Sequence, residues 1–392
     1  MTLIGATGQA DVTDPRQAGM QAVSQALNGL GKVSPSLCLI IVPHRYDPQL
    51  VINGAASVLT NVPMIGFSVS SGLAADGAHS QSVIVGILGG DSLQAETHWF
   101  PAYSQSTAEA ATRIMQLLGY EQRPANNVIV FADGLNADTE EFCNNLPAGL
   151  PVLGGLASGS LVNANTFQIA GMQSGSGALA AAFLRGNFKI GTGYGHGWHP
   201  VGGHFRVTRA RGFWLRTLDG HPASETYAQL FGKPSREWSA HPLNTMCRIY
   251  PLGFEQDYTE ELLVRAPIRV EADGSLRMNS FLRDGSDAYL MVGSPADCQN
   301  TAREAAKQAQ AQLGRSKPAF ALVLVDMAWQ MLLQAQPGQE IKVVQEVLGE
   351  SVPILGGYTL GQIVPPQGQN TRPKFLNQHI LVAVFSDSDK PD

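Results

Sequence analysis

The chain has 392 residues, of which 44% are hydrophobic and 15% are charged, and its formal net charge is −6. This composition is that of a globular protein with a substantial core and enough length for two or more domains. The negative charge argues against a general nucleic-acid-binding protein, because contacts with phosphate groups need an excess of Lys and Arg.

The cysteines and the hydropathy pattern indicate the compartment. Cys38, Cys143, Cys247 and Cys298 are scattered without C-x-x-C spacing, which favours a reducing compartment and argues against a zinc ribbon. The first residues lack the basic start and apolar centre of a signal peptide. No apolar run approaches the roughly 20 residues that a membrane helix needs. We therefore expect a cytoplasmic protein without a membrane segment.

In chain order, residues 1–34 are expected to form a helix with an alanine-rich face, and the charged residues 386–392 a frayed tail. The segment 233–238 has linker character, so we expect an N-terminal domain at 35–232 and a C-terminal domain at 233–385. Two hairpins are expected within the first domain, one pairing 82–88 with 93–100 and the other pairing 177–184 with 188–192.

One pattern occurs three times. Val62–Ser68, Leu150–Leu156 and Val352–Tyr358 each start with an apolar residue and a proline and lead through apolar residues to glycine. Each follows a helix, an apolar strand and a second helix. The earlier helices are expected at 16–27, 107–118 and 296–313, the strands at 37–42, 127–131 and 320–325, and the later helices at 49–59, 138–146 and 339–348. Apolar strands that alternate with helices predict an α/β fold with mixed sheets built from repeated βα units.

The glycine-rich ends of these strands are candidate ligand sites, because open α/β sheets bind ligands where their strands end. Serine hydroxyls and free N–H groups there could bind a small ligand, although ordinary turn chemistry accounts for them equally well. The candidate binding residues of this kind are Gly154, Gly155, Ser158, Gly356, Gly357 and Tyr358.

A second candidate is the histidine-rich segment 194–200, with His204 close behind. Imidazole is a ligand for haem iron and for other metals, so His196, His199 and His204 are candidate metal ligands. Trp198 could cover a planar cofactor, and Arg206 could meet a haem propionate. The alternative is a polar turn with solvated histidines, and a basic strand face around Arg206. Other histidines that could ligate are His44, His79, His98, His221, His241 and His379.

Several motifs in the same order and spacing resemble the FIST family of sensory proteins. They are the Val62–Ser68 and Leu150–Ser158 stretches, then 195–200 with Val207-Thr208, 218–223, 241–243, Val264-Arg265, 273–276 and 356–363. The resemblance covers about residues 35–385, and it implies N-terminal and C-terminal FIST regions packed together.

What the resemblance implies is a small-ligand-binding protein of signal transduction. One subgroup of stand-alone members looks like haem-based nitric oxide sensors, which implies haem b as cofactor and a histidine kinase regulated in trans. Two alternatives stay open, namely a haem-free sensor of an amino acid or other metabolite, and an interaction scaffold without a ligand. A homodimer is compatible with each.

An enzyme is not expected. The chain has no G-x-S-x-G, H-E-x-x-H or phosphate-loop motif. Cys247, beside Arg248, is the one cysteine whose neighbours suggest a nucleophile, and packing is the more common role for such a residue.

Overall fold

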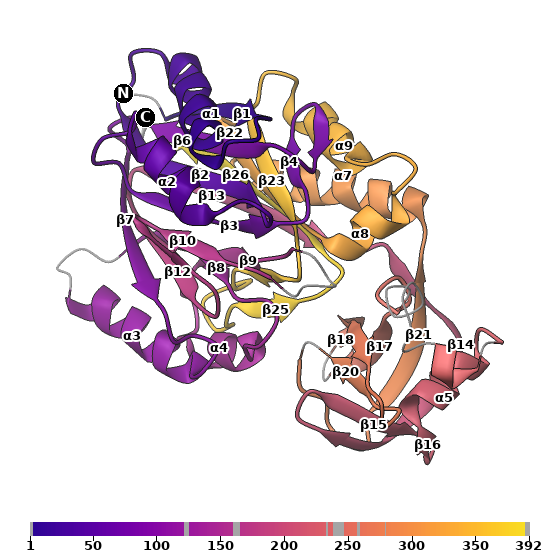
Figure 1. Cartoon of the computed structure of the whole chain (residues 1–392). Coiled ribbons are helices and arrows are strands. Elements are labelled where there is room, and N and C mark those ends of the chain that lie inside the picture. Colours follow the sequence, from indigo (N-terminus) through magenta and orange to yellow (C-terminus); the bar gives the residue numbers. More distant parts are fainter. Residues whose placement is uncertain are drawn as a thin grey trace.

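The computed structural model describes residues 3–120, 125–159, 165–232, 234–237, 247–256, 259–278 and 280–388. Its larger body consists of three units with the same strand order (Figure 1). Each unit begins with a strand, continues through a helix, a second strand and a further helical segment to a third strand, and ends with a fourth strand. The second and third strands are parallel to each other, and the fourth lies antiparallel between the first and the second. The repeat that the sequence predicted is therefore a repeat of the fold.

The bounds of these elements follow the predictions closely, except for β1 and α8, which were not predicted. Unit 1 contains β1 (Ile4–Ala10), α1 (Pro15–Leu30), β2 (Pro35–Pro43), α2 (Pro48–Ala56), β3 (Met64–Val69) and β6 (Val83–Gly89). Unit 2 contains β7 (Leu93–Phe100), α3 (Thr107–Tyr120), β8 (Asn127–Ala132), α4 (Thr139–Asn145), β9 (Val152–Leu156) and β12 (Leu179–Gly186). Unit 3 contains β13 (Phe188–Gly195), α7 (Pro295–Gln312), β22 (Phe320–Asp326), α8 (Met327–Leu332), α9 (Gln339–Leu348), β23 (Ile354–Thr359) and β26 (Ile380–Asp387).

Local sequence explains where several helices begin. Asp14, Asp47 and Ser294 each cap a helix whose first residue is proline, and each side chain accepts a hydrogen bond from a backbone N–H in the first turn. Proline suits that position because the first N–H groups of a helix have no partner within the helix.

Short hairpins join the three units in a cycle. They are β4 (Gly72–Ala74) with β5 (Gly77–His79), β10 (Gln168–Ala170) with β11 (Gln173–Gly175), and β24 (Gln362–Val364) with β25 (Lys374–Leu376). The hairpin after β3 extends the sheet of unit 3, the one after β9 extends unit 1, and the one after β23 extends unit 2. Each unit thus completes the sheet of another.

The three sheets face one another and helices cover their outer faces. Leu39, Phe131, Leu153, Leu322 and Leu355 belong to one buried cluster between the sheets. Their strand neighbours pack in separate clusters against the helices. Strands that are buried on both faces have apolar side chains at successive positions. The sequence of these strands therefore shows no alternation of apolar and polar residues.

Residues 198–293 form a smaller lobe inserted between β13 and α7 (Figure 1). It contains β14 (Trp198–Arg211), β15 (Trp214–Leu218), β16 (His221–Pro222), α5 (Ala223–Gln229), η1 (Ser235–Glu237), β17 (Leu252–Gln256), β18 (Thr259–Arg265), β19 (Pro267–Val270), β20 (Leu276–Met278) and β21 (Asp287–Gly293). The boundary expected near residue 232 falls inside this lobe.

The N-terminal and C-terminal segments differ from the predictions. Residues 4–10 are a strand rather than part of a helix, and β1 pairs with β6. Ser386 and Asp387 are ordered residues of β26: Ser386 is buried, and Asp387 accepts hydrogen bonds from Leu3 N at 2.8 Å and Ser92 Oγ at 3.0 Å. The two ends of the body are therefore held together.

Both hairpin predictions are wrong in their pairing, although the strands exist. β6 lies between β1 and β2, whereas β7 pairs with β12 in another sheet. β12 lies between β7 and β8, whereas β13 pairs with β26. A tight turn permits a hairpin, but here each of these strands pairs with other strands of its own sheet and not with the strand across the turn.

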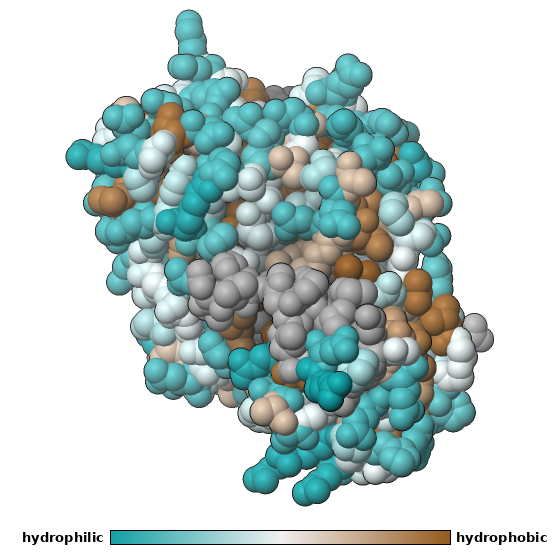
Figure 2. Space-filling model, turned by 45° about the vertical axis from the view of Figure 1, so that its right-hand side comes forward, coloured by the Kyte–Doolittle hydropathy of each residue, from teal (hydrophilic) through white to brown (hydrophobic). Residues whose placement is uncertain are grey.

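The face in Figure 2 is largely hydrophilic, with apolar residues in small groups. None of the helices in the described part of the chain is both long and apolar enough to cross a bilayer.

Candidate functional site

The three glycine-rich strand ends meet in the body, and there they bind one another. Ser158 N–H donates to Ser68 O at 2.9 Å, Ser68 Oγ donates to Ser158 O at 2.8 Å, and Ser158 Oγ donates to Tyr358 O. Tyr358 N–H donates to Ser71 O at 3.1 Å. Ser68, Ser158 and Tyr358 have no exposed surface. We call this group of strand ends the hub.

The binding residues predicted at the strand ends make contacts within the protein. Gly154 and Gly356 lie against the backbone of the neighbouring strand, and Gly155 and Gly357 lie against side chains. The Tyr358 hydroxyl donates to Glu340 Oε1 at 2.5 Å in the core. A cavity of about 580 Å³ borders the strand ends beside β2, lined by His44–Pro48, 165–167 and Ser176. In the described part of the chain these residues make contacts within the hub, and none of Gly154, Gly155, Gly356, Gly357 and Tyr358 lines the cavity beside β2.

Glu340 gives a pH prediction for this region. Burial raises the pKa of its carboxyl, whereas the hydrogen bond from Tyr358 opposes the rise. The folded protein therefore binds this proton more tightly than the unfolded chain. The resulting stabilisation is complete below the unfolded pKa and is lost as the pH rises through the folded pKa, by about 1.4 kcal/mol per unit of pKa difference.

Glu340→Gln imitates the protonated carboxyl, so it should remove this loss. Urea unfolding of the variant and the parent should agree below the ordinary glutamate pKa and diverge as the pH rises through the higher folded pKa, above which the variant is the more stable. Parallel pH profiles for the two proteins would show that folding does not raise the pKa of Glu340.

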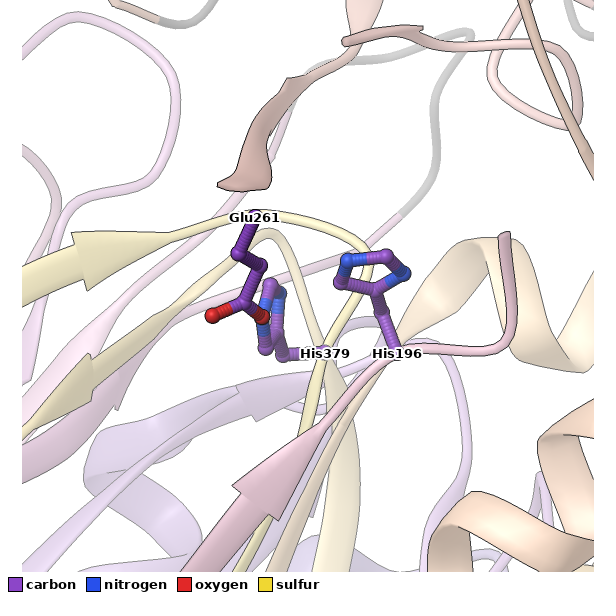
Figure 3. A group of neighbouring side chains, drawn as sticks. All are labelled: His196, Glu261 and His379. Atoms are coloured by element: carbon purple, nitrogen blue, oxygen red, sulfur yellow. The ribbon is translucent and has the colours of Figure 1, made fainter. Parts of the chain in front are cut away.

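A second site lies at the base of the lobe, where β13 leads into β14. His196 follows β13, His379 precedes β26, and Glu261 belongs to β18 of the lobe. One ligand atom from each lies within 4.8 Å of the others, and the side chains point toward one another (Figure 3). The His196 and His379 ring centroids are 4.9 Å apart. We call these residues the junction cluster.

Hydrogen bonds orient both imidazoles. His379 Nδ1 lies 2.6 Å from Asn377 O. A carbonyl oxygen can only accept, so Nδ1 carries the proton and Nε2 presents its lone pair. His196 Nδ1 accepts from Trp198 N–H at 3.2 Å. Burial is the largest cause that lowers the pKa of His196 to about 4 and that of His379 to about 3, so both rings are neutral at pH 7.

A cavity of about 640 Å³ adjoins this cluster. We call it the junction cavity. Its floor includes the buried Trp198 and Met291, and the carboxylates of Glu255 and Glu261 lie at its wall. Tyr289 donates to Glu255 Oε1 at 2.7 Å. The lining residues are His196, Trp198, Pro200, Gly202, Glu255, Gln256, Glu261, Leu262, Tyr289 and Met291.

The three histidines predicted as metal ligands do not converge. Only His196 belongs to the junction cluster. His199 is exposed, and its Nε2 lies 3.8 Å from Asp297 Oδ1. His204 is also exposed and packs near Tyr289. Arg206 pairs with Asp287 at 3.1 Å instead of reaching this cavity. His241 lies outside the described residues. Glu261 was not singled out from the sequence, and His379 was only one of several histidines.

The protein is thus of the α/β class, with three repeated units that meet at the hub and a smaller lobe inserted into the third unit. Family models match residues 36–221 as a FIST N domain and residues 223–365 as a FIST C domain. The chain belongs to the FIST family, whose domains are small-ligand sensory domains of signal transduction.

Two solved structures align along nearly all of the chain. A chorismatase is 11% identical, with 98% of this chain and 99% of that one covered and a TM-score of 0.37. A cyanuric acid hydrolase is 8% identical, with 99% and 100% covered and a TM-score of 0.35. Similarity at this level indicates nothing about activity. A search of curated proteins found no match.

Proposed function

We propose that this protein senses a small molecule that carries an amine or another positive charge, and that it binds this molecule in the junction cavity. The supporting observation is the lining: two carboxylates, Glu255 and Glu261, with no Lys or Arg among the described lining residues. Trp198, Leu262 and Met291 offer apolar contact to the rest of the ligand. A volume of about 640 Å³ is in the range of small-molecule sites.

The position of the cavity suggests how binding becomes a signal. Its walls come from β14, β17, β18 and β21 of the lobe and from His196 at the edge of the body. A ligand that contacts both parts favours the arrangement for which it has the higher affinity. We propose that a partner in trans, such as a histidine kinase, responds to this change in the position of the lobe.

We propose that haem b is not held between His196 and His379 in the junction cluster. A haem clamped between His196 and His379, with metal–nitrogen distances of about 2 Å, would hold the ring centroids about 6 Å apart. The observed 4.9 Å leaves no room for a porphyrin between them. Propionates would also meet Glu255 and Glu261 without a described basic lining residue. We therefore favour the haem-free alternative, and with it a signal other than nitric oxide.

We also propose that the protein is not catalytic. Burial raises the pKa of the Cys247 thiol to about 12, which disfavours a thiolate nucleophile at pH 7.

A ligand screen tests this proposal. Chelator-treated protein, mixed with the standard amino acids and short diamines, should show a raised melting temperature with at least one amine, because binding to the folded state alone stabilises it. Glu255→Gln keeps an acceptor for Tyr289 but loses the charge, so it should reduce the shift. Arg45→Gln, in the cavity beside β2, is the matched control and should leave it unchanged.

Besides the absence of any amine-induced shift, two results would count against the proposal. One is a shift that survives Glu255→Gln but disappears in Arg45→Gln. The other is a Soret band in the freshly purified protein, which would restore haem as the ligand.

A further inference from the structure

The junction cluster combines side chains that the sensing proposal does not require together. It contains two neutral imidazoles and one carboxylate, and among the described residues no other group of three or more His, Cys, Asp or Glu side chains converges in this way. The three come from segments far apart in the sequence, because β18 belongs to the lobe and the two histidines flank strands of the body. Their convergence therefore depends on how the lobe sits on the body.

We infer that His196, Glu261 and His379 form a binding site for a divalent transition-metal ion such as Zn²⁺. Two imidazoles and a carboxylate are a donor set that such ions take in proteins, with further positions left for water or a ligand. The inference does not depend on the proposed function, because an ion could bind here in a protein that senses nothing.

The surroundings of His379 match those of a metal-binding histidine. Its Nδ1–H donates to a backbone carbonyl, which fixes the tautomer and leaves Nε2 facing the cluster. The ring is buried and packs near Tyr194, at 6.4 Å between centroids. A neutral imidazole held in one orientation can bind an ion without first losing a proton or reorganising.

Metal binding requires small movements of the other two ligands. Donor atoms around a tetrahedral ion stand about 3.4 Å apart for metal–ligand distances near 2.1 Å, which is closer than the 4.8 Å limit found here. Glu261 is exposed and can close the gap by side-chain rotation. His196 must move its proton from Nε2 to Nδ1 when Nε2 binds the ion, so it gives up the hydrogen bond from Trp198 N–H.

That exchange would connect the ion to the lobe. Trp198 is the first residue of β14, the strand that leads from the body into the lobe, and its indole N–H donates to Ile249 O at 2.8 Å. When His196 no longer accepts the hydrogen bond from Trp198 N–H, a contact is lost at the residue where the lobe joins the body. Occupancy of the site and the position of the lobe are thus coupled.

Cobalt titration of the chelator-treated full chain tests the inference, with Co²⁺ as a visible probe and Zn²⁺ as competitor. We expect one equivalent of Co²⁺ to produce d–d absorption bands that Zn²⁺ removes. His196→Gln and Glu261→Gln should weaken binding by at least about 100-fold, the upper end of the effect of losing a second-shell partner. His199→Gln and His204→Gln, which alter nearby exposed histidines, should leave affinity within about twofold.

His379→Gln changes a buried residue and can fail to fold, so the His196 and Glu261 variants decide the outcome. Absence of stoichiometric Co²⁺ binding overturns the inference. So does binding that persists in both decisive variants, or binding that is lost in His199→Gln or His204→Gln. Metal binding without any amine-induced thermal shift would support the site and contradict the sensing proposal, so the two failures are distinguishable.

Discussion

Glu140→Ala should destabilise the protein by about 3 kcal/mol, although Glu140 is partly exposed. Its Oε2 accepts a hydrogen bond from Arg265 Nη2 at 3.0 Å, and the Arg265 side chain is only 2% exposed. Burial lowers the pKa of Arg265, and Glu140 opposes this effect. Removal of the carboxylate leaves a buried charge without its counter-ion, which lowers the free energy of unfolding by about 3–5 kcal/mol. Because the Glu140 side chain is 37% exposed, we expect a loss at the lower end of this range.

A change of Arg265, the other partner of this ion pair, should lower the free energy of unfolding by a smaller amount. Arg265→Met removes the buried charge itself and leaves Glu140 to be hydrated, so the loss of stability should be smaller than that of Glu140→Ala. Arg303 and Glu346 form an exposed pair at 3.4 Å, and Glu346→Ala should stay within about 0.5 kcal/mol of the parent. Urea unfolding measures all three, and equal losses for Glu140→Ala and Glu346→Ala would contradict the account.

This ion pair also bears on the candidate site. Arg265 lies on β18, the same strand as Glu261, and it binds that strand to α4 through Glu140 and to β25 through Phe375 O at 3.3 Å. Loss of the pair should therefore also weaken Co²⁺ binding, because it loosens the strand that brings Glu261 to His379.

Gly154→Ala should be the second large effect, with a loss of about 3 kcal/mol from overpacking. A Cβ at Gly154 would overlap the carbonyl oxygen of Val130 on the paired strand β8, and backbone cannot move aside as a side chain can. Gly66 and Gly356 lie in the same way against Ile40 O and Val323 O. The glycine of each repeated motif thus permits close approach of two parallel strands.

The next residue provides the matched control. A Cβ at Gly155 would lie 3.1 Å from Leu324 Cδ1 and Thr359 Cγ2, which are side-chain atoms that can shift. Gly155→Ala should therefore cost about 1 kcal/mol or less. Thermal unfolding of the two variants separates them by several degrees. A Gly154→Ala protein as stable as Gly155→Ala would show that the strands have room at this position.

The repeated unit could be predicted because its signals are local. Proline at the strand start, a continuous apolar run and a terminal glycine occur in each copy, and the structure has β2, β8 and β22 parallel to β3, β9 and β23. Burial on both faces produces such runs, so they predicted sheets covered by helices.

Strand pairing between distant segments could not be predicted in this way. The β4–β5 hairpin adds to β23, more than 270 residues later, and nothing in its short sequence specifies that partner. Strand β1 was missed because Gly5 and Gly8 replace the expected apolar residues. A Cβ at Gly5 would meet Phe320, and one at Gly8 would meet helix α1, so small residues are needed for packing that only the fold makes visible.

The candidate site was predictable in part. Glycines around His196 marked an unusual segment, and the structure places His196 in the junction cluster. Glu261 and His379 had no distinguishing motif, since each becomes a neighbour of His196 only when the lobe rests on the body. His199 belongs to the same segment and His204 follows it, but both lie on exposed parts of β14.

The most direct test is a crystal structure of the protein bound to the amine that gives the largest thermal shift. The account predicts ligand density between Glu255 and Trp198, in the junction cavity, and a lobe whose position differs from that in a crystal of the same protein grown without the ligand. Density at the ends of β3, β9 and β23, or in the cavity beside β2, with the junction cavity empty, would contradict it.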